Sequence, residues 1–313
     1  MRALVTGVAG FVGSTIGARL ATEGWDVVGI DAFTDYYDVA LKKENLARLP
    51  DSVEVHAARI QDVDLDALLR DVDVVFHEAG QPGVRSSWGR EFAIYIDQNI
   101  RATQLLLEAA RTAPRLSRLV YASSSSVYGD ALRYPTTEAD RPAPVSPYGV
   151  TKLAAEHLCS LYAANFGLPT VSLRYFTVFG PRQRPDMAFT RFLTAAATGT
   201  SITLYGTGEQ VRDFTYVDDI VEANLRAATE RVPPGTVLNI AGGTNVSVNQ
   251  VLDIMGVTTG RTIAVDRQPR SDGDVERTGG DASQAAQLLG WQPRVGIEEG
   301  IACQWAWVRE RHG

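Results

Sequence analysis

Three glycines at the junction of a strand and a helix constrain the fold of this chain more than any other feature. The apolar run 3–6 predicts a short buried strand, and a helix-like run over 14–22 follows the glycines. Gly7 permits a tight turn, Gly10 lets the backbone approach a pyrophosphate at the helix N-terminus, and Gly13 allows the helix to pack closely on the strand. The pattern predicts the first half of a dinucleotide-binding βαβ unit.

An acidic residue after the second predicted strand indicates which dinucleotide binds. The strand over 26–30 ends at Asp31, which lies 18 residues after Gly13. A carboxylate at this place accepts a hydrogen bond from the ribose 2′-hydroxyl of NAD and repels the 2′-phosphate of NADP. We therefore expect the cofactor to be NAD.

Strands and helices continue to alternate after this unit. The patterns predict strands over 52–56, 72–77, 117–122 and 171–175, and helices over 65–69, 92–111 and 153–166. This alternation predicts an α/β fold with a Rossmann-like, doubly wound parallel sheet, whose ligands lie beyond the carboxyl ends of the strands. We expect residues 1–174 to form this domain, with 212–238 returning to it, while 175–211 and 239–313 form a smaller C-terminal lobe.

Charge and composition limit the partners of the chain. Its net charge is −7 and it has no block of Lys or Arg, which argues against nucleic acid or an anionic membrane as a partner. No apolar run approaches the ~18 residues of a membrane span, and the N-terminus lacks signal-peptide anatomy. The two cysteines form no disulfide framework, Cys159 is expected in the core, and the four histidines show no metal-ligand spacing. These features predict a cytoplasmic protein without a metal.

Tyr148 and Lys152 lie four residues apart at the start of a predicted helix. On one helix face, the Lys152 ammonium would lower the pKa of the Tyr148 phenol from about 10 and make it a general base. Such a pair on an exposed helix turn can also have no function. Ser123–Ser126 follow a predicted strand, and these four hydroxyls form either a polar turn or a site for a substrate hydroxyl. Because Gly7–Gly13, Ala79–Gln81 and the serines all follow strands, we expect them to converge near Tyr148.

Six motifs in the same order make the chain resemble the extended short-chain dehydrogenase/reductase superfamily, in particular its nucleotide-sugar epimerases and dehydratases. The matching segments are Gly7-x-x-Gly10-x-x-Gly13, Asp31, Ser123–Gly129, Tyr148-x-x-x-Lys152, Arg174 through Arg182, and Arg212 through Asp219. The resemblance implies a tightly bound NAD, with Tyr148 as the base and Lys152 as its electrostatic partner and a ligand of the cofactor ribose. It also implies that Ser124 binds the reacting hydroxyl, with Ser126 beside it in the catalytic set. The implied cofactor contacts are Gly7, Gly10, Phe11, Val12, Gly13, Asp31, Ile60, Ala79, Gly80, Gln81, Asn99, Ser123, Tyr148 and Lys152.

The residues at positions 125 and 126 separate the reactions catalysed within this superfamily. Dehydratases place an Asp-Glu pair there, and UDP-glucuronate decarboxylases tend to place an acid at position 126, whereas this chain has Ser125 and Ser126. Without these carboxylates an elimination lacks its proton carriers, so we expect C4 epimerisation by transient oxidation to a 4-keto sugar. The segments 31–42 and 176–188 resemble those of UDP-glucuronate 4-epimerases, and Thr177 stands where UDP-glucose epimerases usually have Asn. The alternatives are a UDP-glucose/galactose 4-epimerase, a UDP-glucuronate decarboxylase, and a catalytically silent NAD-sensing protein.

A UDP-uronate would need ligands for its carboxylate and its diphosphate, and we expect the C-terminal lobe to bind the UDP-sugar. The candidates for the carboxylate are Thr177, Arg184, Arg85, Ser86, Ser125 and Ser126. Arg212 and Arg270 are the candidates for the diphosphate, because guanidinium groups pair well with phosphate. Surface or intramolecular salt bridges are the alternative for these two arginines.

Two positions depart from the family pattern. Arg59 stands where related enzymes often have an Asp beside adenine, so adenine would be bound by a backbone group or by Asp62. Glu78 replaces a commoner Leu, and we expect it to be an exposed residue at the sheet edge.

Helices 92–111 and 153–166 carry apolar residues on more than one side. The family resemblance implies that these helices pair with their copies in a homodimer. The alternative is that both faces are covered within one chain.

Overall fold

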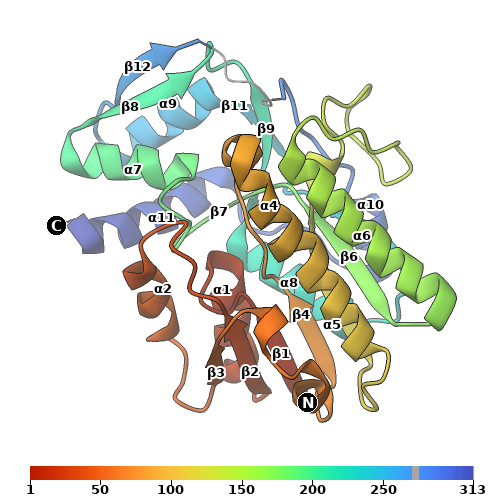
Figure 1. The fold of residues 1–313 in the computed structure, drawn as a ribbon. Coiled ribbons are helices and arrows are strands. Elements are labelled where there is room, and N and C mark those ends of the chain that lie inside the picture. The colour runs from red at the N-terminus through yellow and green to blue at the C-terminus, as the bar shows by residue number, and fades with distance from the viewer. Residues whose placement is uncertain (270–274, 313) are drawn as a thin grey trace.

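A parallel sheet of seven strands forms the centre of the molecule (Figure 1). The computed structural model describes residues 1–269 and 275–312, so Arg270 lies outside the described residues. The strand order is β10-β6-β5-β4-β1-β2-β3, and every neighbouring pair is parallel. The strands are β1 (Arg2–Thr6), β2 (Asp26–Asp31), β3 (Glu54–Ala57), β4 (Val74–His77), β5 (Arg118–Ser124), β6 (Thr170–Tyr175) and β10 (Thr236–Ile240). The predicted doubly wound α/β fold is confirmed.

Helices cover both faces of this sheet, because alternate side chains of each strand point to opposite sides. In β1, Leu4 belongs to a core with residues of α5 and α6, whereas Ala3 and Val5 belong to a core with residues of α1 and α8. The helices on the first face are α3 (Leu65–Leu69), α5 (Ala102–Ala110) and α6 (Pro147–Phe166), and those on the second are α1 (Phe11–Thr22), α8 (Val217–Thr229) and α10 (Ser283–Leu289). Helix α2 (Val39–Leu46) packs beside α1.

The helix predicted over 92–111 is not regular along its length. It consists of α4 (Phe92–Tyr95), a π-helical stretch (Ile96–Arg101) and α5. Asn99 lies in the π-helical stretch and is buried; its Oδ1 accepts from Gln81 N at 2.6 Å, and its Nδ2 donates to Gln81 O at 3.1 Å. Local widening of a helix often occurs at functional sites, and here it accompanies the contact between this helix and the loop after β4.

The rest of the chain forms a smaller lobe with two small sheets. The first is β11-β9-β7 and the second β12-β8. Its elements are β7 (Thr177–Phe179), β8 (Ser201–Tyr205), β9 (Val211–Tyr216), β11 (Thr244–Ser247), β12 (Ala264–Gln268), α7 (Ala188–Thr198), α9 (Val248–Thr259) and α11 (Ile297–His312). Although α8 and β10 follow β9 in the chain, they pack on and extend the main sheet. The exact division of the chain into domains stays a prediction.

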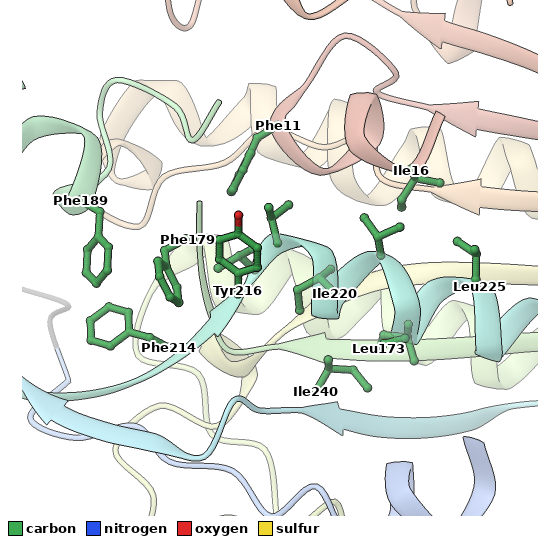
Figure 2. Close-up of a cluster of buried hydrophobic side chains, with 14 of the residues drawn as sticks. Phe11, Ile16, Leu173, Phe179, Phe189, Phe214, Tyr216, Ile220, Leu225 and Ile240 are labelled. Atoms are coloured by element: carbon green, nitrogen blue, oxygen red, sulfur yellow. The ribbon is translucent and has the colours of Figure 1, made fainter. Parts of the chain in front are cut away.

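An aromatic cluster joins this lobe to the main sheet (Figure 2). The ring centroids of Phe189 and Phe214 are 4.7 Å apart, those of Phe179 and Phe189 4.9 Å, and those of Phe179 and Tyr216 5.6 Å. Phe11, the first residue of α1, belongs to the same buried cluster. Burial of apolar surface stabilises such contacts by ~25 cal/mol per Å², so this packing ties the lobe to the glycine-rich turn.

Within residues 1–269 and 275–312, no helix is both long enough and apolar enough to cross a membrane. The same residues contain no group of three or more His, Cys, Asp or Glu side chains that could hold a metal ion.

Candidate active site

The glycine-rich turn has the conformation that a dinucleotide diphosphate requires. Gly7 has a φ of 69°, and a Cβ at this position would lie 2.9 Å from Ala79 N. A Cβ on Gly13 would lie 2.2 Å from Gly7 O, so α1 can approach β1 this closely only with glycine there. Gly10 caps α1 without a side-chain hydrogen bond, which leaves the N-terminal amides of Phe11 and Val12 without a side-chain cap. An anion fits at such a helix N-terminus.

Asp31 is a buried carboxylate at the end of β2. Its Oδ2 accepts from Ala9 N at 3.1 Å and its Oδ1 from Phe33 N at 2.8 Å. Lys42 Nζ, which sequence reasoning missed, lies 3.7 Å from Oδ1. These three contacts fix the orientation of the carboxylate beside the glycine turn, as a ribose ligand needs.

At the predicted adenine end, Arg59 and Asp62 are already paired with each other. Arg59 Nε and Nη2 donate to the Asp62 carboxylate at 2.7 and 2.9 Å. Ile60 lies buried between them at the start of a 3₁₀ turn. Asp62 is thus engaged by Arg59, which leaves a backbone group as the simpler ligand for adenine.

Tyr148 lies in the first turn of α6, as the sequence predicted. Ser146 caps this helix by accepting from Gly149 N at 3.1 Å, and Pro147 occupies the first helical position. The Ser124 side chain lies near the Tyr148 hydroxyl and acts to lower the pKa of this phenol. Ser124 also accepts from Ser126 N at 3.1 Å, so the serine turn after β5 presents Ser124 to the phenol.

The charge around Tyr148 differs from the sequence prediction. Burial raises the pKa of Tyr148 above 10, while the hydrogen bond with Ser124 and the charge of Arg184 oppose this rise. Lys152 was expected to lower the pKa of Tyr148, but its buried ammonium interacts with Glu78 and Glu156 instead. The Lys152 side chain points toward β5, where its Nζ lies 4.7 Å from the ring centroid of Tyr121.

Glu78 is not the exposed edge residue that we expected. Its Oε1 accepts from the hydroxyl of Tyr175 at 2.8 Å, and burial raises the pKa of its carboxyl to about 7. The strand β4 lies in the middle of the sheet rather than at its edge, so the residue after it turns inward.

A buried ion pair binds both ends of the serine turn. Arg174 donates to Glu156 through Nη2 at 2.6 Å and through Nε at 2.9 Å. Ser123 Oγ donates to the same carboxylate at 2.6 Å, and Arg174 Nη1 donates to Tyr128 OH at 2.6 Å. Both ends of the turn, Ser123 and Tyr128, are therefore fixed by one charge-paired network.

A second group of polar side chains, from two loops, a 3₁₀ turn and α4, lies near Tyr148. Arg184 Nε and Nη2 donate to the Asp186 carboxylate at 2.9 and 3.0 Å. Tyr36 OH lies 3.5 Å from Asp186 Oδ2 and 3.3 Å from Ser86 Oγ. The Ser86 hydroxyl is in turn 2.7 Å from Tyr95 OH, whose ring packs edge-on against Tyr148 with centroids 6.4 Å apart.

This group brings together two predicted carboxylate ligands, Arg184 and Ser86, and three residues that sequence reasoning missed. Tyr36, Tyr95 and Asp186 follow no motif spacing. For Tyr36 and Asp186 the one sequence signal was the resemblance of segments 31–42 and 176–188 to UDP-glucuronate 4-epimerases, whereas Tyr95 lies outside both segments.

The remaining arginine candidates lie in other surroundings. The Arg85 guanidinium is stacked 4.4 Å from the ring centroid of Tyr205. Arg212 donates through Nη2 to Val275 O at 2.7 Å and through Nη1 to Val211 O at 2.9 Å. Both guanidinium groups make contacts within the chain, and their role as ligands stays a prediction.

Comparisons with known proteins agree with this arrangement. Residues 3–241 match the model of the NAD dependent epimerase/dehydratase family. The chain is 40% identical to an uncharacterized UDP-glucose epimerase, YtcB, of Bacillus subtilis, with 98% of each chain covered. It is 37% identical to a probable UDP-glucuronate 4-epimerase of Rhizobium meliloti, covering 100% of this chain and 98% of that protein.

Among solved structures, the chain is similar to UDP-glucuronic acid 4-epimerase from Bacillus cereus in complex with UDP-glucuronic acid and NAD. The TM-score is 0.95 at 39% identity, covering 99% of this chain and 100% of the other. With the glycine turn, the acid after β2 and the Tyr148–Ser124 pair in one fold, these matches place the chain in a family: it belongs to the NAD dependent epimerases and dehydratases.

Proposed function

We propose that this chain catalyses the NAD-dependent C4 epimerisation of UDP-glucuronate to UDP-galacturonate. The observation that carries the proposal is the position of Tyr148, in the first turn of α6 beside the serine turn after β5, at the strand ends that also carry the dinucleotide turn. A phenol paired with a serine hydroxyl can take a proton from a sugar hydroxyl held between them. Relatives described as UDP-glucuronate 4-epimerases, at 36 and 37% identity over nearly the whole chain, support the choice of sugar.

The residues of the chain move one proton and hold the sugar. Tyr148 takes the proton of the C4 hydroxyl, with Ser124 orienting that hydroxyl, and gives the proton back after the sugar has turned. Bound NAD⁺ supplies the acceptor for the C4 hydride and adds a positive charge that opposes the raised pKa of the buried Tyr148. Lys152, at the start of α6, is the proposed ligand of the cofactor ribose, and its charge fits an oxygen-rich group.

A different set of residues suppresses loss of CO₂ from the 4-keto uronate, which is a β-keto acid. Ser125 and Ser126 offer hydroxyls and no general acid beside the sugar. Arg184, Thr177 and Ser86 are the proposed ligands that hold the carboxylate away from the geometry for C–C cleavage. Arg184 lies close enough to Tyr148 for its charge to lower the pKa of the phenol.

A specific contact supports the second candidate, a UDP-glucose/galactose 4-epimerase. Asp186 pairs with two nitrogens of Arg184, so the charge facing the sugar is partly neutralised before any uronate binds. The 40% identity to a UDP-glucose epimerase of Bacillus subtilis points in the same direction.

One assay separates the candidates. The purified protein is mixed with UDP-glucuronate or UDP-glucose and the anomeric signals are followed by ¹H NMR. We expect UDP-galacturonate from UDP-glucuronate, with kcat/KM at least ~10-fold above that for UDP-glucose. Faster conversion of UDP-glucose, or a UDP-pentose product, would replace the proposal with one of its alternatives.

We also propose that the chain forms a homodimer in the cytoplasm. Helices α4 and α6 lie side by side on one face of the molecule (Figure 1). They carry large exposed apolar side chains, with 42% of Ile94, 46% of Val150, 54% of Leu161 and 54% of Phe166 accessible. A second copy of the same face would cover them. The two free cysteines suit a reducing compartment. Light scattering on a size-exclusion column measures the assembly; a monomer would contradict the dimer.

A further inference from the structure

The loop after β7 has an unusual backbone conformation. Gly180 has a φ of 139°, and Arg182, which is not a glycine, has a φ of 69°. A Cβ on Gly180 would lie 2.7 Å from Val217 Cγ1, so the loop approaches α8 closely at this point. Residues with a side chain rarely adopt a positive φ and keep it only where their surroundings fix the backbone. The loop from Gly180 to Arg184 therefore needs contacts that hold it in this shape.

A buried amide on α11 makes such contacts. Gln304 lies on this helix, which packs against α7 (Figure 1), and its side chain is buried. Its Oε1 accepts from Gly180 N at 3.0 Å, and its Nε2 donates to Gln183 Oε1 and to Thr190 Oγ1, both at 3.1 Å. Because a backbone N–H can only donate, the contact with Gly180 fixes which end of the amide faces the loop. One side chain thus joins the start of the loop, its middle and the helix after it.

Gln183 completes this network from within the loop. Its Nε2 donates to Val178 O at 2.9 Å, and its Oε1 accepts from Thr190 N at 3.0 Å. Thr190 Oγ1 donates to Gln183 O at 3.0 Å. The N-cap residue of α7, Met187, makes no side-chain cap, so Gln183 binds a helix amide that a cap would otherwise satisfy. We refer to Gln304, Gln183 and Thr190 as the amide clamp.

Packing alone does not explain a glutamine at position 304. The other buried residues of α11 are apolar or glycine: Ile297, Gly300, Ile301, Trp305 and Val308. An apolar side chain of similar length would fill the same space, but it would leave the buried N–H of Gly180 without its acceptor, which destabilises this shape of the loop. The amide therefore selects one conformation of the loop.

Arg184 follows the amide clamp directly in the chain. Gln183 N donates to Gly180 O at 3.2 Å and Met187 N donates to Arg184 O at 3.1 Å, so the backbone is fixed on both sides of Arg184. From there its side chain reaches the site, where Cζ lies 5.9 Å from the ring centroid of Tyr36. The position of this cation depends on the backbone that the amide clamp holds.

We propose that Gln304 is a positioning residue: its buried amide fixes the Gly180–Arg184 loop and thereby sets where the Arg184 guanidinium meets an anionic sugar. Helix α11 then contributes to the selectivity between a uronate and a neutral hexose without touching either sugar. The effect on substrate choice rests on the proposed function, whereas the effect on the loop does not.

Hydrogen exchange tests the loop without a substrate. The NAD-bound protein and its Gln304→Met variant are compared by mass spectrometry on peptides that cover residues 180–190. Met keeps the length of the side chain and removes all three hydrogen bonds of the amide, so we expect amide exchange in these peptides to become at least about tenfold faster. If this variant does not fold, Thr190→Val takes its place, because it removes one hydroxyl of the amide clamp with little change in shape. Unchanged exchange would overturn the proposal.

Val308→Ala is the matched control. Val308 is also buried on α11, one turn after Gln304, and its truncation leaves a cavity while the hydrogen bonds of the amide clamp remain. We expect this variant to melt at a lower temperature and to keep exchange in residues 180–190 at the wild-type rate. Equal acceleration in Val308→Ala and Gln304→Met would show a general loosening and overturn the proposal.

Steady-state turnover supplies the second readout. We expect kcat/KM for UDP-glucuronate to fall about tenfold in Gln304→Met and that for UDP-glucose to fall less than about threefold. In an Arg184→Met background, Gln304→Met should add no further loss with UDP-glucuronate, because the side chain that it positions is already absent. Equal losses for the two sugars, or additive losses in the double variant, would indicate a structural role alone and overturn the proposal. If exchange accelerates but the wild-type protein epimerises no UDP-sugar, the proposed function fails and the role of Gln304 in holding the loop stands.

Discussion

Removing the charge of Glu156 tests the network that supports the serine turn. The side chains of Arg174 and Glu156 are 5% and 2% exposed, and two hydrogen bonds join them. Glu156→Gln leaves the Arg174 guanidinium buried with one neutral acceptor in place of a carboxylate. Breaking a buried pair by removing one partner costs about 3–5 kcal/mol, because an uncompensated charge remains.

The expected shift in melting temperature follows from this free-energy cost and the length of the chain. With an unfolding entropy of ~2.1 cal/mol/K per residue, a chain of 313 residues loses about 5–8 °C in Tm for this cost. The assay is urea unfolding at fixed NAD concentration of Glu156→Gln, Arg174→Met and the double variant. We expect the double variant to lose at least about 2 kcal/mol less than the sum of the single variants. Single losses below about 1 kcal/mol, or additive losses, would refute the argument.

Three further predictions concern charge at the site. Because burial raises the pKa of Glu78 from 4.5 to about 7, the wild-type protein is most stable relative to Glu78→Gln below pH 4.5. This difference in the free energy of unfolding shrinks by up to about 3 kcal/mol as the pH rises to 7. Urea unfolding across this pH range measures the difference, and a constant value would contradict the prediction. Arg184→Met should lower kcat/KM for UDP-glucuronate about 30-fold, or ~2 kcal/mol, and that for UDP-glucose far less; equal losses in steady-state assays would exclude Arg184 as a carboxylate ligand. Asp31→Ser should weaken NAD binding at least about tenfold in calorimetry without weakening NADP, since the carboxylate favours a ribose hydroxyl over a phosphate; unchanged NAD affinity would speak against this role.

Local motifs allowed much of the fold and site to be predicted. The glycine spacing and the apolar runs on either side of it predicted β1, the turn and α1, and the structure shows the steric reason for glycine at Gly7 and Gly13. The positions of Asp31 at the end of β2 and of Tyr148 at the start of α6 were predictable as well, because each follows directly from the predicted strand or helix.

Interactions between distant segments could not be predicted. No sequence pattern near Glu78 indicates that the hydroxyl of Tyr175, 97 residues later, donates a hydrogen bond to its carboxylate. The link from Tyr36 to Asp186 spans 150 residues and depends on how the small lobe packs against the sheet. The direction of Lys152 likewise follows from the depth of α6 over Tyr121, which helix spacing alone does not contain.

The motif from Arg212 to Asp219 shows a different limit. Sequence reasoning singled out its arginine as a phosphate ligand, yet its two buried acids serve the fold. Asp213 accepts from Gly243 N at 3.1 Å, and Asp219 accepts from Arg294 N at 3.0 Å and Val295 N at 3.1 Å. The motif thus combines two structural anchors with an arginine whose role as a ligand stays a prediction.

In the proposed reaction the C4 hydrogen leaves the sugar as a hydride and returns to the opposite face of the same molecule. UDP-[4-²H]glucuronate is incubated with the protein in ordinary water, and the product is examined by NMR and mass spectrometry. We predict UDP-galacturonate that retains the deuterium at C4, and no product with Tyr148→Phe. Loss of the deuterium to water, or undiminished epimerisation by Tyr148→Phe, would contradict the account.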